Sequence, residues 1–419
     1  MKIRLTTNLI YQILFAICIG VTYLNIYELT FAMWSATFLF TLKKAYSVTV
    51  IKYIMCFAAI FGIALISAYF NSQKTYNLFR DMTYLVKPIL GILVGYQLCR
   101  NINIKPLYTL LYTGLFIAGV HLVLIAYSIV IYRIINIHEL RYLTGYFSDF
   151  EIYALIIACF STRFNIELTY RKKVIFIAIL GISSFLYLSR TNFIQFFIFF
   201  IGMLGYLKLN KRSLIIMGSM ILAATAFYSV IYHMNFTRNG KGLDGLMYKI
   251  KNAPIEAFKT KIKTDDYRDF NDNYRSYENI ITIRQVSNQG TSMILFGKGM
   301  GATIDLGREV WSNDGEFIRY IPVLHNGFMT IYLKSGLAGI FVYLIFLFFL
   351  CRQSHSDIPI VNEINLILTA TGIFLIMATW VLLGLYLKIE NKSIIIGFLL
   401  CYKELVNKAS YRQIPNATT

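Results

Sequence analysis

Charged residues are scarce in this chain of 419 residues, where Asp, Glu, Lys and Arg make up 15% and hydrophobic residues 57%. The mean hydropathy is +0.59, far above that of an average water-soluble domain. This composition excludes an ordinary soluble enzyme. It predicts an all-α polytopic membrane protein.

Acidic residues are the scarcer of the two charge classes, with 21 Asp and Glu against 40 Lys and Arg and a formal net charge of +19. The basic residues are scattered over short connections instead of forming one basic face, which argues against a nucleic-acid partner. A basic excess of this kind is typical of cytoplasmic loops that orient a membrane protein.

Several chemical signatures are also missing. The six cysteines all lie in or beside apolar segments and none lies in the polar segment 233–323, so no disulfide framework or zinc cluster is expected. No nucleotide-binding glycine loop, serine nucleophile elbow or HExxH sequence occurs. The spacing of the acidic residues between 265 and 272 fits no calcium loop. We therefore predict neither a metal nor a cofactor.

Long apolar segments are what the chain does contain. About twelve are long enough to cross a bilayer, or nearly so: 8–24, 28–42, 51–70, 82–98, 106–132, 146–161, 173–189, 191–207, 214–232, 327–351, 361–387 and 393–402. Every second short connection is basic, which predicts that these connections and both termini are cytoplasmic. The chain then divides into nine spans in 1–232, one large extracytoplasmic loop with short helices in 233–323, and C-terminal spans with a cytoplasmic tail in 324–419. Within the loop we predict a helix over Tyr277 to Met293.

The large loop has no counterpart elsewhere in the chain, so no internal repeat is visible. Transporters commonly consist of related halves. The pattern therefore disfavours a transporter.

Arginine and lysine residues at the bilayer edge are candidates for substrate binding, because a charge there is costly unless it has a role. Arg190 lies between two apolar runs almost without a linker, and Lys87 precedes a proline below the predicted outer surface. Arg80 stands just outside the same span. The alternatives are snorkelling to lipid head groups for Arg190 and a structural ion pair for Lys87 or Arg80.

His325 is the candidate catalytic residue, because it lies where the polar loop re-enters an apolar helix and a neutral imidazole accepts a proton near neutral pH. A structural histidine is the alternative. Arg284 lies on the predicted loop helix, and the residues alone give it no preference over other loop arginines. Gly297, Gly299 and Gly301 predict a tight turn, with anion binding by its amides as the alternative.

Three of these segments together resemble a known family. His325-Asn326, nine residues, and then Gly336-Leu337-Ala338-Gly339 is similar to the H-N-x9-G-x-x-G signature of the O-antigen polymerase and O-antigen ligase superfamily. The Ser189-Arg190-Thr191 corner, and the Arg284 segment leading to Gly297 through Gly301, resemble that family's pattern in the same order.

The resemblance implies a GT-C-like glycosyltransferase of the bacterial inner membrane with its active site on the periplasmic side. Its donor would be an undecaprenyl-diphosphate-linked oligosaccharide. Arg190 and Arg284 would hold the diphosphate, and His325 would act on the acceptor hydroxyl without a metal. Asn326, Gly336 and the other glycines, Gly339 included, would position the helix start and allow close packing.

The expected reaction is polymerisation, in which a growing glycan passes from one lipid diphosphate to a new lipid-linked repeat unit. Membrane lipid, a chain-length regulator and a flippase are the expected partners. One alternative is a ligase that transfers the glycan to lipid A core. A second is a flippase or other transporter of lipid-linked oligosaccharides. Polymerase is preferred over ligase on the Ile-, Tyr-, Phe-, Asn- and Lys-rich composition.

Overall fold

The computed structural model describes residues 7–71, 74–102, 105–134, 137–145, 148–207, 211–237, 259–263, 265–311 and 315–413, with short separate pieces between 244 and 254. A helix coincides with each of the twelve predicted apolar segments. In the first part of the chain these are α1 (Thr7–Gly20) with the 3-10 helix η1 (Val21–Leu24), α2 (Tyr27–Phe40), α3 (Val48–Phe70), α4 (Thr75–Asn101), α5 (Pro106–Tyr132), α7 (Asp149–Cys159), α8 (Tyr170–Leu186), α9 (Arg190–Met203) and α10 (Lys211–His233).

The remaining apolar segments form α15 (Gly327–Cys351), α16 (Pro359–Val381) and α17 (Lys392–Gln413), with the 3-10 helix η2 (Gly384–Tyr386) between the last two. Among the described helices, α3, α4, α5, α15 and α16 are long and apolar enough to cross a membrane. These helices support a largely helical, membrane-embedded protein. Twelve crossings, and the side on which each loop lies, stay predictions.

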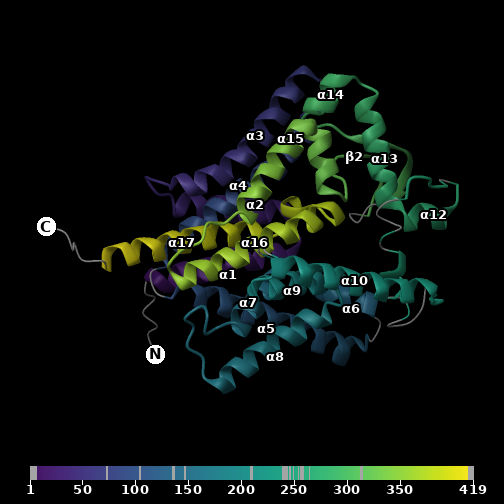
Figure 1. Cartoon of the computed structure of the whole chain (residues 1–419). Coiled ribbons are helices and arrows are strands. Elements are labelled where there is room, and N and C mark those ends of the chain that lie inside the picture. Colours follow the sequence, from purple (N-terminus) through teal and green to yellow (C-terminus); the bar gives the residue numbers. More distant parts are fainter. Residues whose placement is uncertain are drawn as a thin grey trace.

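The segment after α10 is partly folded. It contains α12 (Tyr267–Asp272), α13 (Tyr274–Ser287), α14 (Thr291–Phe296) and the antiparallel strands β1 (Ile304–Trp311) and β2 (Phe317–Ile321). Another short helix, α6 (Ile137–Thr144), lies earlier in the chain, before α7. In Figure 1, α12 and α13 lie at the end of the structure opposite to the start of α1 and the end of α17. The polar segment thus lies at the far end of the bundle from both chain ends.

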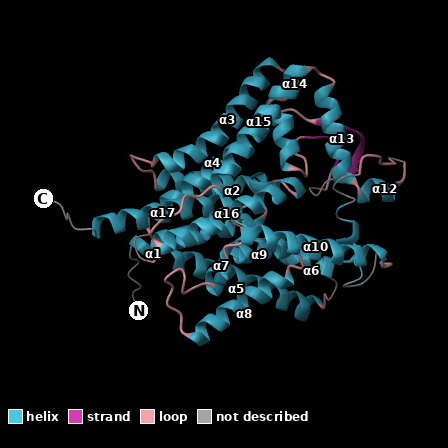
Figure 2. Cartoon of the chain, viewed as in Figure 1, coloured by secondary structure: helices cyan, strands magenta, loops and turns pink. Residues whose placement is uncertain are grey.

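Two local features of this segment differ from the sequence prediction. The helix predicted over Tyr277 to Met293 is broken, because Gly290 adopts a φ of +106° and separates α13 from α14. The strand pair, magenta in Figure 2, was not predicted. A register shift between Asp305 and Val310 interrupts the alternation of buried and exposed residues by which a strand is recognised.

Helix α17 shows how the bundle closes. Its apolar residues 394–401 are all buried, and it packs against α4 at glycine positions. A Cβ atom on Gly95 would lie 1.9 Å from the Ile394 carbonyl oxygen, and one on Gly397 would lie 2.0 Å from that of Ile92. The backbones of α4 and α17 therefore approach more closely than any larger side chain allows.

The glycine turn 297–301 is clamped between α3, α4 and α15. The Lys298 N–H donates to the Leu333 carbonyl at 2.8 Å, and the Met300 N–H donates to the Ala64 carbonyl at 2.9 Å. The Gly301 N–H donates to Asp81 Oδ2 at 2.7 Å. These amides have protein partners, so the geometry supports the tight-turn interpretation rather than anion binding.

Helix α15 is interrupted where the turn touches it. Gly336 has φ +62° and ψ −160°, and a Cβ atom there would lie 2.4 Å from the Leu295 carbonyl. At Gly299, with φ +88°, a Cβ atom would lie 2.3 Å from the backbone nitrogen of Ala68. A Cβ on Gly339 would meet Ser335 Oγ at 1.8 Å. Gly299 and Gly336 thus let the polar segment dock on the bundle, and Gly339 leaves room for the Ser335 side chain within α15.

Candidate functional site

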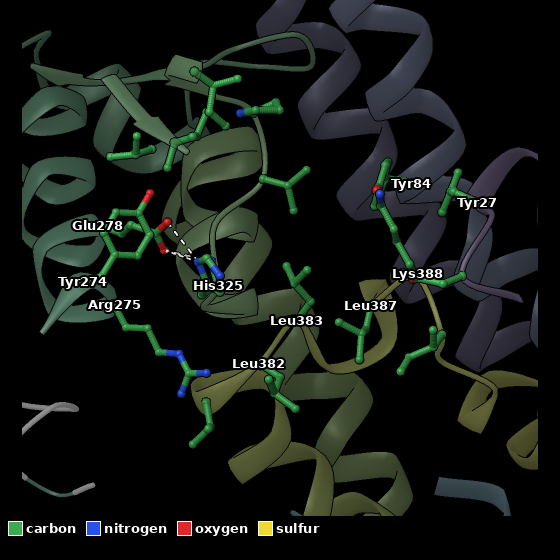
Figure 3. A pocket seen from close by; sticks show the side chains of 18 of the residues that line it. Tyr27, Tyr84, Tyr274, Arg275, Glu278, His325, Leu382, Leu383, Leu387 and Lys388 are labelled. Atoms are coloured by element: carbon green, nitrogen blue, oxygen red, sulfur yellow. Dashed lines mark hydrogen bonds and ion pairs between the residues drawn. The ribbon is translucent and has the colours of Figure 1, made fainter. Parts of the chain in front are cut away.

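A cavity of about 2160 Å³ lies between the polar segment that contains α12, α13 and the strands, and the helices of the bundle. Figure 3 shows one wall, formed by α13 and the start of α15, facing a second wall that carries Tyr27, Tyr84 and Lys388. The described charged residues that line the cavity are Glu28, Arg80, Arg141, Arg190, Arg275, Glu278, Arg308, Glu309, Glu316, His325 and Lys388. Cations outnumber carboxylates around this space, so it suits an anionic ligand.

His325 lies at the edge of this cavity and is paired with a carboxylate of α13. Its Nδ1 is 3.0 Å from both Glu278 oxygens, and its backbone N–H donates to Glu278 Oε2 at 3.0 Å. The Glu278 side chain is 2% exposed, whereas that of His325 is 49% exposed. With Nδ1–H donated to the carboxylate, Nε2 on the opposite side of the neutral ring is left as a proton acceptor.

The position of His325 follows from how α15 begins. The next residue, Asn326, is the N-cap, and its side chain accepts a hydrogen bond from the Met329 N–H at 3.2 Å. The Gly327 N–H then donates to the Leu382 carbonyl at 2.9 Å. A Cβ on Gly327 would lie 2.8 Å from Thr379 Cγ2. Asn326 is buried and does not line the cavity, so its geometry fits the positional role.

Tyr274 packs against the imidazole of the His325–Glu278 pair. Its ring meets the His325 ring edge-on, with centroids 5.6 Å apart and an interplanar angle of 86°. Burial, and next the charge of Glu278, raise the pKa of the Tyr274 hydroxyl. This phenol therefore stays neutral beside the carboxylate. The pair is shielded from water on that side.

Arg80 lines the cavity from α4, as expected of a substrate-binding candidate. Its Nε is 3.5 Å from Asp81 Oδ1. Neither its Nε nor its Nη2 makes a hydrogen bond with a described residue. Asp81 is engaged by Lys334, whose Nζ is 2.5 Å from its Oδ2. Arg80 thus lines the cavity beside a carboxylate whose stronger partner is a lysine of α15.

Arg190 also lines the cavity, as the first residue of α9. The preceding corner is tight, because Leu188 adopts a φ of +46°, which is rare for a residue with a side chain. Ser189 then takes the N-cap position in extended conformation. The strained corner fixes Arg190 where α9 meets the cavity.

Arg284 is not brought to the cavity. It is exposed and does not line the space that holds His325. Arg275 on the same helix does line it, and Figure 3 shows the Arg275 guanidinium directed into the space below the imidazole. The two arginines are about two and a half helical turns apart, so they lie on opposite faces of α13. The structure therefore does not bring Arg284 to the cavity with Arg190 and His325, and Arg275 lies there instead.

Lys87 is likewise outside the cavity lining, in a structural position. It is fully buried, and its Nζ donates to the Leu387 and Lys388 carbonyls at 2.6 and 2.8 Å. The same ammonium lies 5.3 Å from the centre of the Trp34 ring. Lys87 therefore holds the loop after α16, whose Leu387 and Lys388 form part of the cavity wall.

Sequence reasoning missed Glu278, Arg275 and Lys388. Glu278 is the only carboxylate between Asp272 and Asp305, and this isolation was the available signal. Arg275 lies three residues before it, on the same helical face. Nothing in the sequence distinguishes Lys388 from other loop lysines.

The arrangement supports proton abstraction at His325 beside a cationic space. Among the described residues, no three His, Cys, Asp or Glu side chains gather as a metal site requires. Metal independence stays a prediction. No model of a known protein family matches the chain, and no curated protein matches it either.

Proposed function

We propose that the cavity is the active site of a membrane glycosyltransferase whose donor is a sugar linked to a polyprenyl diphosphate. The observation that carries the proposal is the His325–Glu278 pair, which opens on a cavity lined by several guanidinium groups. A buried carboxylate on Nδ1 is the arrangement that orients an imidazole for work at Nε2.

The reaction is a displacement at the anomeric carbon. His325 Nε2 takes the proton of an acceptor sugar hydroxyl, and the hydroxyl oxygen forms the new bond to the anomeric carbon. The bond from that carbon to the diphosphate oxygen breaks, and its electron pair leaves with the polyprenyl diphosphate. Glu278 balances the charge of the imidazolium formed. A positioned base of this kind contributes about 10²- to 10⁴-fold in rate.

The leaving group gains negative charge, which Arg80, Arg190 and Arg275 are placed to neutralise, since all three line the cavity. Guanidinium groups form bidentate hydrogen bonds with phosphate oxygens. Each well-oriented contact to the developing charge contributes about 2–4 kcal/mol. Together they offer the neutralisation that a divalent cation provides elsewhere.

Polymerisation is the form of this reaction that we propose. The donor is then an undecaprenyl-diphosphate-linked glycan and the acceptor a lipid-linked repeat unit, on the periplasmic side of a bacterial inner membrane. The resemblance of His325-Asn326 and Gly336 to the O-antigen polymerase and ligase signature supports this donor for either reaction, and the Ile-, Tyr-, Phe-, Asn- and Lys-rich composition favours the polymerase. The wide cavity supports two bulky substrates.

The test uses the purified full chain in lipid nanodiscs with undecaprenyl-diphosphate-linked repeat units. We expect a ladder of longer glycans, lost in His325→Ala and retained in His355→Ala, a matched change at an exposed histidine outside the cavity. A ladder that persists in His325→Ala removes the imidazole from the mechanism. A product formed only when lipid A core is added identifies the ligase, and movement of lipid without bond formation identifies a transporter.

A further inference from the structure

The end of the β1–β2 hairpin carries an unburied aromatic pair. Trp311 and Phe317 are partners across the strands, with ring centroids 4.9 Å apart and an interplanar angle of 73°. They are 65% and 67% exposed, yet both line the cavity that holds His325. Each exposed ring leaves a large apolar surface in contact with water. Such a surface inside a cavity wall suits a ligand that covers it.

The base of the hairpin is firmly held. The Arg319 guanidinium donates to both Asp305 oxygens, at 2.7 and 2.9 Å. The Gln285 side chain pairs with the Asp305 backbone, donating at 2.5 Å and accepting at 3.1 Å. The Tyr277 hydroxyl donates to the Leu306 carbonyl at 2.6 Å. These bonds fix the base of the hairpin against α13, and the paired strands carry the aromatic rings at the other end.

The surroundings of the pair are those of a sugar site rather than a lipid site. Arg308, Glu309 and Glu316, which are close to the two rings in sequence, line the same cavity. A pyranose has an apolar C–H face, which stacks on an aromatic ring, and a rim of hydroxyls, which pair with carboxylates and guanidiniums. Acidic neighbours disfavour insertion among anionic lipid head groups, which attract basic segments.

The hairpin also separates the aromatic pair from His325 along the chain. Strand β2 runs from Phe317 to Ile321 over roughly 13 Å, and the chain then passes through Pro322 and Val323 to His325. Phe317 is therefore separated from His325 along the chain by the whole of β2 and the loop that follows it.

We propose that Trp311 and Phe317 form an outlying glycan subsite, which stacks a pyranose ring of an oligosaccharide whose reacting end lies at His325. This subsite rests on the proposed function for its place in a reaction, but binding of an oligosaccharide to it is measurable without any reaction. It recognises glycans of several units and discriminates against single sugars.

The test is calorimetric titration of the full chain in nanodiscs with defined oligosaccharides of glucose, galactose and N-acetylglucosamine, from one unit upward. We expect binding that strengthens with length and weakens about tenfold in Trp311→Ala, the loss that corresponds to one stacking contact. Trp311→Phe should restore most of it. Tyr69→Ala, at an exposed ring of α3 outside the cavity, should leave binding unchanged.

Two results would overturn the subsite. One is that no oligosaccharide binds, or that all bind equally to wild type and Trp311→Ala. The other is that bromine-labelled phosphatidylglycerol in the nanodisc quenches an emission component present in wild type and absent in Trp311→Phe, which places the ring in lipid. Repeating the titration in His325→Ala separates the two proposals. Length-dependent binding without glycan transfer by the wild type leaves the subsite standing alone.

Discussion

Replacing Glu278 by Gln tests whether the carboxylate orients the His325 imidazole, because this substitution changes the shape of the side chain least. Gln keeps the volume and an acceptor oxygen, but it removes the charge and presents an N–H₂ group toward His325 Nδ1. That donor favours the tautomer with hydrogen on Nε2, which cannot accept a proton from a sugar hydroxyl. Glu278 acts here as a positioning residue, through the imidazole.

The expected loss in kcat/KM for Glu278→Gln follows from the 3.0 Å separation of His325 Nδ1 and the Glu278 oxygens. Two unit charges at this distance attract by about 5.5 kcal/mol at an effective dielectric constant near 20 and by about 1.4 kcal/mol in bulk water. The His325 side chain is 49% exposed, so solvent screening places the value between these limits, at about 3 kcal/mol. This corresponds to about a 10²-fold loss in kcat/KM.

The assay is kcat/KM for glycan transfer by the purified protein at a fixed pH. Glu278→Asp, which keeps the charge but withdraws it from the imidazole, should give a smaller loss than Glu278→Gln. Asp357→Asn, at an exposed loop carboxylate, serves as the matched control. A kcat/KM within about threefold of wild type in Glu278→Gln would refute the reasoning.

Three further outcomes are expected. Arg275→Ala should lower kcat/KM by about 10²-fold, the loss typical of one contact to developing charge. Arg284→Ala should retain transfer. Equal losses in the two variants would place Arg284 at the site as well. Arg190→Lys should be impaired about tenfold or more in the same assay, because the planar fork is lost although the charge stays; wild-type activity would show that charge alone suffices. Gly299→Ala should lower the melting temperature in detergent by an amount equivalent to about 1–3 kcal/mol, because a Cβ atom there meets the backbone of α3 and the residue has a positive φ. Gly62→Ala should leave the melting temperature unchanged, because nothing lies within 4 Å of a Cβ atom at that position.

The helices and their order could be predicted from the sequence because long apolar runs leave few alternatives in a bilayer. The hairpin could not, because its bulge interrupts the alternating pattern. Of the residues that line the cavity, Arg190 and Arg80 were predicted from their charge at the membrane edge, and His325 from its place where the polar loop re-enters an apolar helix. Glu278 and Arg275 were not predicted, because only the orientation of α13 brings them to the cavity, and a sequence does not say which side of a polar helix is buried. The same ambiguity left Arg284 without a preference over Arg275.

Asp81 joins three parts of the molecule that are distant in sequence. It accepts hydrogen bonds from the Gly301 N–H and from Lys334 of α15, and it adjoins Arg80. The guanidinium of α4 and the helix that begins beside His325 are consequently parts of one braced frame. The loop after α16 is tied to α4 through Lys87, and α13 is tied to the start of α15 through the Glu278–His325 pair. Both walls of the cavity are therefore anchored on the same two helices, α4 and α15.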